Sequence, residues 1–253
     1  QPQVFFERLL WFDQVWVPSQ WQKICLIEQG FPPEKIFIVH EGIDEDIINL
    51  VPITYPSHPE KLKFVVVGRW EHRKSTKEII QAFNSEFKQD EPVELLISAD
   101  NQFATDKQST TEKLKECGIS DQRITPVKFS DRANYLKLLQ QSHVFLSCSR
   151  SEGWNIPLTE AMALGIPCIF SDYGAQLEYG EDFPLRVKTK DEPANFGENE
   201  TGIGNWGNPD FTHLKTILRS AFNNYKALQK ESVQLSLKIK KMLEWDNSVT
   251  QSL

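Results

Sequence analysis

The sequence predicts an α/β protein built on a doubly wound parallel sheet, and three observations support this class. From residue 37 onward, short β-branched runs alternate with stretches of helical periodicity, as they do in repeated βαβ units. The apolar runs are continuous, which is typical of strands that helices cover on both faces. With 253 residues, 40% of them hydrophobic and 25% charged, the chain is long enough to bury such a sheet.

The first fifty residues are expected to be the end of a separate N-terminal unit. The pattern predicts a strand over residues 12–18, a helix over residues 20–28 that Gly30 closes, and a strand over residues 35–39. Prolines then mark a connector that leads into a main domain over residues 51–245. Residues 246–253 are expected to form a tail.

The main domain is predicted to contain five strands separated by helices. The strands are residues 63–67, 93–98, 124–129, 143–148 and 166–170. Apolar residues at spacings of three and four predict helices that can cover the sheet, at residues 76–87, 134–142, 211–225 and 228–243. The Gly- and Asn-rich residues 197–209 are predicted to be a loop.

The composition excludes several functional classes. A formal net charge of −7, from 28 basic and 35 acidic residues, does not suit a nucleic-acid-binding surface. No apolar run approaches the roughly 20 residues of a membrane span and no signal peptide opens the chain, so a soluble, cytoplasmic protein is expected. The four cysteines lack metal-ligand spacing, which favours buried free thiols. Because the chain begins at Gln1 rather than Met, we expect it to be part of a longer protein.

The first chemical motif is VGRWEHRK, residues 67–74, placed where a buried strand ends and a helix begins. Ligands of open α/β sheets bind at the carboxyl ends of strands, and a helix N-terminus offers N–H groups and a partial positive charge to phosphate. Arg69 and Lys74 add two cations there. The alternative is that these are solvated loop charges.

The second motif is SEGWNIPLTE, residues 151–160, which follows the strand HVFLSC. Seven residues separate Glu152 from Glu160, and Pro157 begins a helix between them, so Glu152 precedes the helix and Glu160 lies within it. A carboxylate accepts hydrogen bonds well from vicinal hydroxyl groups, as it does from ribose in dinucleotide folds. The alternative is a helix N-terminal charge plus a surface glutamate.

Together with VHEGID at residues 39–44, these motifs resemble the nucleotide-sugar-binding, Rossmann-like C-terminal half of a family 4 retaining glycosyltransferase of the GT-B type. The match runs in order from Val15 to Trp245 and so covers most of the chain. The resemblance implies transfer of a hexosyl unit from a nucleoside diphosphate sugar to a hydroxyl group with retention. The implied acceptor is a carbohydrate or glycoconjugate in polysaccharide assembly, and a membrane surface enters only through a lipid-linked acceptor.

The resemblance also implies roles for individual residues. Arg69 and Lys74 would hold the donor diphosphate and take up its charge on departure, and Glu160 would bind ribose. Glu152 would orient the sugar as a binding group. Separately from the resemblance, the place of Trp154 in the loop is expected to put its ring near the sugar or nucleotide. Arg69, Lys74 and Glu152 are thus the catalytic candidates. The full set of donor-binding candidates is Gly68, Arg69, Lys74, Glu152, Gly153, Trp154, Asn155, Ile156 and Glu160.

The chain departs from the family in three respects. Asn155 stands where the family often has a second glycine, and Ser75 stands where a glycine usually follows Lys74. An N-terminal acceptor domain is represented only by its last strand and helix, about residues 1–30. A chain acting alone is therefore expected to bind donor but to transfer sugar poorly or not at all.

Several other features are interpreted as unrelated to catalysis. Asp44-Glu45-Asp46 spells a D-x-D metal motif, but it is interpreted as a helix start, and no metal is expected because cations already face the diphosphate. His72 is expected to be a surface histidine, and the sequon at residues 199–201 is expected to be inert.

Three alternative functions remain open. A non-catalytic nucleotide-sugar-binding module, or an excised domain, would share this sequence pattern. Hydrolysis or phosphorolysis would use the same donor site. A nicotinamide-dependent oxidoreductase is disfavoured because no G-x-G-x-x-G motif follows any predicted strand.

Overall fold

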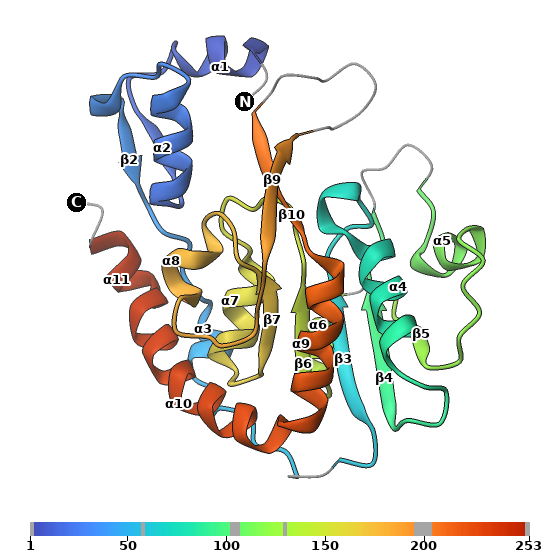
Figure 1. Ribbon diagram of the computed structural model, residues 1–253. Coiled ribbons are helices and arrows are strands. Elements are labelled where there is room, and N and C mark those ends of the chain that lie inside the picture. Colours follow the sequence, from blue (N-terminus) through green and yellow to red (C-terminus); the bar gives the residue numbers. More distant parts are fainter. Residues whose placement is uncertain (1–2, 57–58, 102–106, 129–130, 195–203, 251–253) are drawn as a thin grey trace.

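The computed structural model describes residues 3–56, 59–101, 107–128, 131–194 and 204–250. Its centre is a sheet whose six strands all run parallel, which confirms the predicted class (Figure 1). In spatial order the strands are β5 (Ile124–Pro126), β4 (Val93–Ser98), β3 (Leu62–Val67), β6 (Val144–Ser147), β7 (Cys168–Ser171) and β8 (Arg186–Val187). The order reverses between β3 and β6, and doubly wound sheets bind ligands at this switch point.

Helices cover both faces of the sheet, which explains why its strands are continuously apolar. Phe64 and Val66 face a cluster that includes Phe83 and Leu218, whereas Val65 faces a second cluster that includes Leu158. On the first face lie α4 (Thr76–Glu86), α5 (Thr110–Glu116) and α9 (Phe211–Asn223). On the second lie α3 (Glu45–Ile48), α6 (Arg132–Gln140), α7 (Ile156–Ala163), α8 (Gln176–Gly180) and α10 (Tyr225–Leu243).

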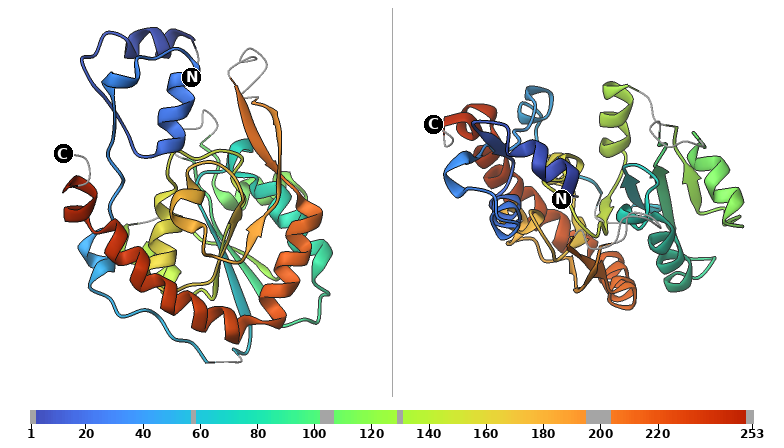
Figure 2. Two further views of the ribbon diagram at one scale, coloured as in Figure 1. Left: turned by 60° about the vertical axis from the view of Figure 1, so that its left-hand side comes forward. Right: turned by 90° about the horizontal axis from the view of Figure 1, so that it is seen from above.

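The N-terminal unit has a small core of its own. It contains α1 (Gln3–Leu9), β1 (Val15–Val17), α2 (Gln20–Glu28), a 3-10 turn (Pro33–Lys35) and β2 (Ile36–Ile38). β1 and β2 form a two-stranded parallel sheet that packs on Leu26 and Phe31. The backbone N–H groups of Gln20 and Trp21 donate to the Glu178 carboxylate at 3.0 and 2.7 Å, which joins α2 to the main domain. Figure 2 shows the unit standing beside one end of that domain.

One predicted loop proves to contain a strand. Residues 205–209 form β10 (Asn205–Pro209), which pairs antiparallel with β9 (Thr189–Pro193), so the loop prediction is wrong there. The segment has low strand propensity, but Trp206 is 1% exposed and its burial stabilises the hairpin. Residues 195–203, with the sequon, lie outside the described residues, as does Phe129 of the predicted third strand.

The remaining differences concern the chain ends and the cysteines. Residues expected as a C-terminal tail continue as α11 (Trp245–Thr250). All four cysteines are free; Cys148 and Cys168 are buried, but Cys25 and Cys117 are only partly so. Among the described residues, no helix combines the length and the apolar character that crossing a membrane requires.

Candidate functional site

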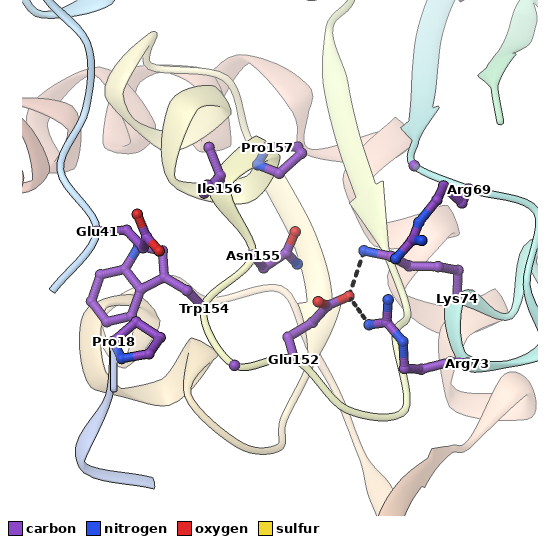
Figure 3. Close-up of a pocket in the computed structure, with 12 residues that line it drawn as sticks. Pro18, Glu41, Arg69, Arg73, Lys74, Glu152, Trp154, Asn155, Ile156 and Pro157 are labelled. Atoms are coloured by element: carbon purple, nitrogen blue, oxygen red, sulfur yellow. Dashed lines mark hydrogen bonds and ion pairs between the residues drawn. The ribbon is translucent and has the colours of Figure 1, made fainter. Parts of the chain in front are cut away.

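A pocket of about 340 Å³ lies beyond the carboxyl ends of β3 and β6, at the switch point of the sheet (Figure 3). Eight of the nine predicted donor-binding residues line it, and Glu160 is placed elsewhere on α7. The complete lining is Pro18, Glu41, Gly68, Arg69, Arg73, Lys74, Glu152, Gly153, Trp154, Asn155, Ile156 and Pro157. Three cations and two carboxylates leave this lining with one net positive charge, which suits an anionic ligand.

The cationic wall comes from the turn that follows β3. Gly68 leaves the strand with φ +153, a backbone angle that favours glycine, and a 3-10 turn (His72–Lys74) then leads into α4. Arg150, just after β6, donates its backbone N–H to the carbonyl of Arg73 at 2.8 Å. The turn after β3 is thereby joined to the loop after β6, so the two predicted motifs meet.

Glu152 is held by two cations. Its Oε1 atom lies 2.5 Å from Nζ of Lys74 and 2.9 Å from Nη1 of Arg73 (Figure 3). Arg73 also donates to the Ser151 carbonyl at 2.8 Å, and Nε of Arg69 lies 3.0 Å from Glu71. The sequence did not single out Arg73, although its position next to Lys74 in a cationic motif was a signal that would have found it.

Glu152 is ionised in this setting. The side chain is buried, and burial alone would raise the pKa of its carboxyl group, but Lys74 and Arg73 outweigh burial and hold that pKa below its usual value. A carboxylate kept ionised between two cations accepts hydrogen bonds and does not donate a proton near neutral pH. This environment is consistent with a binding group and not with a general acid.

Asn155 adopts a backbone conformation that glycine adopts more readily than other residues. Its backbone is left-handed, with φ 82° and ψ 65°, and Asn tolerates that region better than most residues that have a Cβ atom. The buried side chain donates to Oε1 of Gln176 at 2.7 Å and to Oγ of Ser147 at 3.1 Å. The Asn155 side chain therefore braces the loop against β6 and α8.

Ser75, the other position at which the resemblance implies a glycine, also has a left-handed backbone, with φ 56°. Its Oγ atom accepts a hydrogen bond from Nη1 of Arg150 at 2.5 Å, and the same nitrogen donates to the carbonyl of His72 at 2.6 Å. Nη2 of Arg150 reaches Glu78 at 3.1 Å. Arg150 is 4% exposed, and its hydrogen bonds hold residues 72–75, the turn that carries Lys74, from the buried side. No sequence motif marked Arg150, because its partners come together only in the fold.

Glu160 is engaged by residues outside the pocket. Its Oε1 atom accepts from Arg132 at 2.5 Å, and its Oε2 atom accepts from the hydroxyl of Tyr135. Burial raises the pKa of Glu160, although Tyr135 and Arg132 act in the opposite direction. The ribose contact assigned to Glu160 stays a prediction.

The D-x-D segment begins a helix, as interpreted from the sequence. Asp44 is the N-cap of α3, and both carboxylate oxygens of Asp46 accept from Arg132 at 2.8 Å. His72 is 59% exposed at its side chain and packs against Trp206 with ring centroids 5.5 Å apart. The expectation that donor binding needs no metal stays a prediction.

Comparison with known proteins identifies related sequences. Residues 54–192, 139 of 253, match the family described as "Glycosyl transferases group 1". A GDP-mannose:cellobiosyl-diphosphopolyprenol alpha-mannosyltransferase of Xanthomonas oryzae pv. oryzae is 26% identical over 148 residues, 58% of this chain and 37% of that protein. A putative glycosyltransferase 48 of Sulfolobus islandicus filamentous virus is 29% identical over 90 residues, 36% of this chain and 27% of that protein. The chain therefore matches about a third of the length of these relatives.

Solved structures share the fold at low sequence identity. Anabaena HepE, solved in complex with UDP and glucose, superposes with a TM-score of 0.75 and 16% identity, over 99% of this chain and 66% of that one. Sucrose-phosphate synthase from Thermosynechococcus elongatus superposes with a TM-score of 0.73 and 18% identity, over 98% of this chain and 58% of that one. The fold of the chain is thus that of the corresponding part of GT-B glycosyltransferases.

Proposed function

Because the chain belongs to the family of group 1 glycosyl transferases, we propose that it holds the donor in a retaining, family 4 transfer of a hexosyl unit from a nucleoside diphosphate sugar. The observation that carries this proposal is the convergence of Arg69, Arg73 and Lys74 on one pocket at the switch point of the sheet. A diphosphate is the ligand group that three cations beside a helix start suit best. The nucleotide base stays open, since one similar structure contains UDP and one relative is named for GDP-mannose.

In the proposed reaction the bond between the anomeric carbon and the leaving phosphate oxygen breaks, and a bond from the acceptor oxygen forms on the same face of the sugar. The acceptor proton passes to the departing diphosphate, which gains negative charge as it leaves. Arg69 and Lys74 stabilise that charge, so the chemistry needs no metal ion. Glu152, ionised and fixed, orients the sugar hydroxyl groups. The acceptor is proposed to be a carbohydrate or glycoconjugate.

A non-catalytic donor-binding module is the second candidate function. It is favoured by the lining of the described pocket, whose charged residues are suited to binding and where Glu152, held ionised, is not a general acid. Release of nucleoside diphosphate from UDP-glucose or GDP-mannose, with and without an added N-terminal glycosyltransferase domain, separates the candidates. Turnover supports an enzyme, whereas saturable donor binding without turnover in either case supports a module.

Glu160→Gln tests the nucleoside part of the proposal. The substitution is expected to weaken binding of a nucleoside diphosphate by about tenfold while leaving inorganic pyrophosphate affected less, because only the nucleotide carries ribose hydroxyl groups. Glu181→Gln, an exposed change outside the pocket, is the control. Calorimetric titration measures both ligands, and an equal loss for nucleotide and pyrophosphate would argue against a ribose contact.

A further inference from the structure

Glu41 is a charged residue of the pocket whose role the donor-binding motifs leave open. Among the described residues it has no hydrogen-bond or ion-pair partner, whereas Arg69, Arg73, Lys74 and Glu152 are each paired. Figure 3 shows Glu41 and Trp154 on the side of the pocket away from the three cations. The pocket thus has three cations on one side and, on the opposite side, the carboxylate of Glu41, which is unpaired within the part of the chain that the structure describes.

The backbone at Glu41 is fixed by its neighbours on both sides. Nδ1 of His40 lies 2.8 Å from the carbonyl oxygen of Pro18, and the His40 ring packs on Trp154 with centroids 5.1 Å apart. On the other side, the ring of Trp245 packs directly on the backbone of Gly42, so closely that a Cβ atom there would lie 2.3 Å from it. Tertiary contacts, and not an ion pair of its own, therefore place the Glu41 carboxylate in the pocket.

The backbone is also held at Ile43, the residue after Gly42. The backbone N–H of Ile43 donates to the carbonyl of Leu243 at 2.7 Å, where Ile43 and Glu244 form an isolated parallel bridge. Residues 40–43 are thus fastened to the N-terminal unit, to the loop after β6 and to the end of α10. The backbone of Glu41 therefore loses little conformational entropy when a ligand binds.

The chemistry of a bound donor limits what Glu41 can contact. A carboxylate is an acceptor only, and in a partly buried pocket it needs hydrogen-bond donors from water or from a ligand. A diphosphate held by the cations offers none, because its oxygens are acceptors and its charge repels a carboxylate. The sugar is joined covalently to that diphosphate, so it lies in the same pocket, and its hydroxyl groups are donors.

We propose that Glu41 binds the transferred sugar of the donor by accepting hydrogen bonds from its hydroxyl groups. This inference rests on the proposed donor function, but it concerns a residue that the motifs around Arg69 and Glu152 do not contain. It predicts that Glu41 contributes to the affinity for a nucleotide sugar and not to the affinity for the nucleotide alone.

The test compares each nucleotide sugar with its own nucleotide, using UDP-glucose against UDP and GDP-mannose against GDP. Glu41→Gln and Glu41→Ala are expected to weaken binding of the nucleotide sugar by about tenfold, with binding of the nucleoside diphosphate unchanged. Glu45→Gln is the matched control, because Glu45 is an exposed glutamate four residues along that does not line the pocket. The Gln variant keeps the size of the side chain, and thermal unfolding checks that each variant is folded.

The possible results separate the role of Glu41 from the proposed donor binding on which it rests. If the unsubstituted chain binds a nucleoside diphosphate but both Glu41 variants keep the same ratio of sugar-nucleotide to nucleotide affinity, the assignment of Glu41 is overturned and donor binding stands. An equal loss for nucleotide and nucleotide sugar likewise overturns it, since that result indicates a structural role or a contact with the nucleoside. If the unsubstituted chain binds none of UDP, GDP and ADP, the proposed function itself is contradicted.

Discussion

Lys74→Met is expected to weaken binding of a nucleoside diphosphate by about 100-fold, or about 2.7 kcal/mol. Lys74 is 14% exposed at its side chain, so its charge acts in a setting of low dielectric and is little screened by water. Its loss removes the net positive charge of the pocket lining and leaves Glu152 with Arg73 as its cationic partner. The diphosphate then meets a carboxylate that is less neutralised, which adds repulsion to the lost contact.

Arg69→Ala should have a smaller effect, about tenfold, because Arg69 is 45% exposed at its side chain and water screens its charge more. Lys77→Met is the control for Lys74→Met, since Lys77 is exposed at the start of α4 and does not line the pocket. Calorimetric titration with the nucleotide that the chain binds gives all three affinities. A Lys74→Met variant that is folded and binds as tightly as Lys77→Met would refute the diphosphate assignment.

Arg150→Met is expected to lower the free energy of unfolding by about 3 kcal/mol. The substitution removes the donors to the His72 carbonyl and to Oγ of Ser75, and it leaves Glu78 without its partner at 3.1 Å. Ser75 keeps its left-handed backbone, which is strained, and the hydrogen bonds from Arg150 that offset this strain are lost. Since Lys74 lies within the same turn, nucleoside diphosphate binding should weaken as well.

Urea denaturation measures this effect, with Arg186→Met as the matched control. Arg186 pairs with Asp172 at 3.1 Å, but it is 35% exposed, so its loss should cost less than about 1 kcal/mol. Arg150→Lys keeps the charge but loses the planar guanidinium group that reaches several acceptors. Its loss in free energy of unfolding should lie between those of Arg150→Met and Arg186→Met. A loss for Arg150→Met no greater than that for Arg186→Met would contradict a bracing role.

The sheet was predictable because its strands are buried on both faces. β4 and α2 coincide with their predicted bounds, and β3 begins one residue earlier, since continuous apolar runs and a helix closed by Gly30 are strong local signals. β8 has two residues and α8 has five, too few for a periodic pattern. β10 was missed because Asn205, Gly207 and Pro209 disfavour strands, and its pairing with β9 depends on tertiary packing.

The residues of the site that lie in contiguous sequence motifs could be predicted. Those that only the fold brings together could not. Residues 67–74 and residues 151–160 both contribute to the pocket, because each follows a strand that ends at the switch point of the doubly wound sheet. Arg150 was not singled out because its partners come together only in the fold. Glu41 lies within the VHEGID motif, but no role was assigned to it, because only the fold places it across the pocket from the cations. The engagement of Glu160 by Arg132 and Tyr135 was also beyond the sequence, since it joins α6 to α7 in space.

The proposed function requires that the pocket at the switch point bind a nucleoside diphosphate without a metal ion. Titration of the purified chain with UDP, GDP and ADP in buffer containing EDTA, repeated with manganese, tests it most directly. We expect saturable binding of one nucleotide in EDTA, with little change when manganese is added. Failure of all three nucleotides to bind, or binding that appears only with manganese, would contradict it.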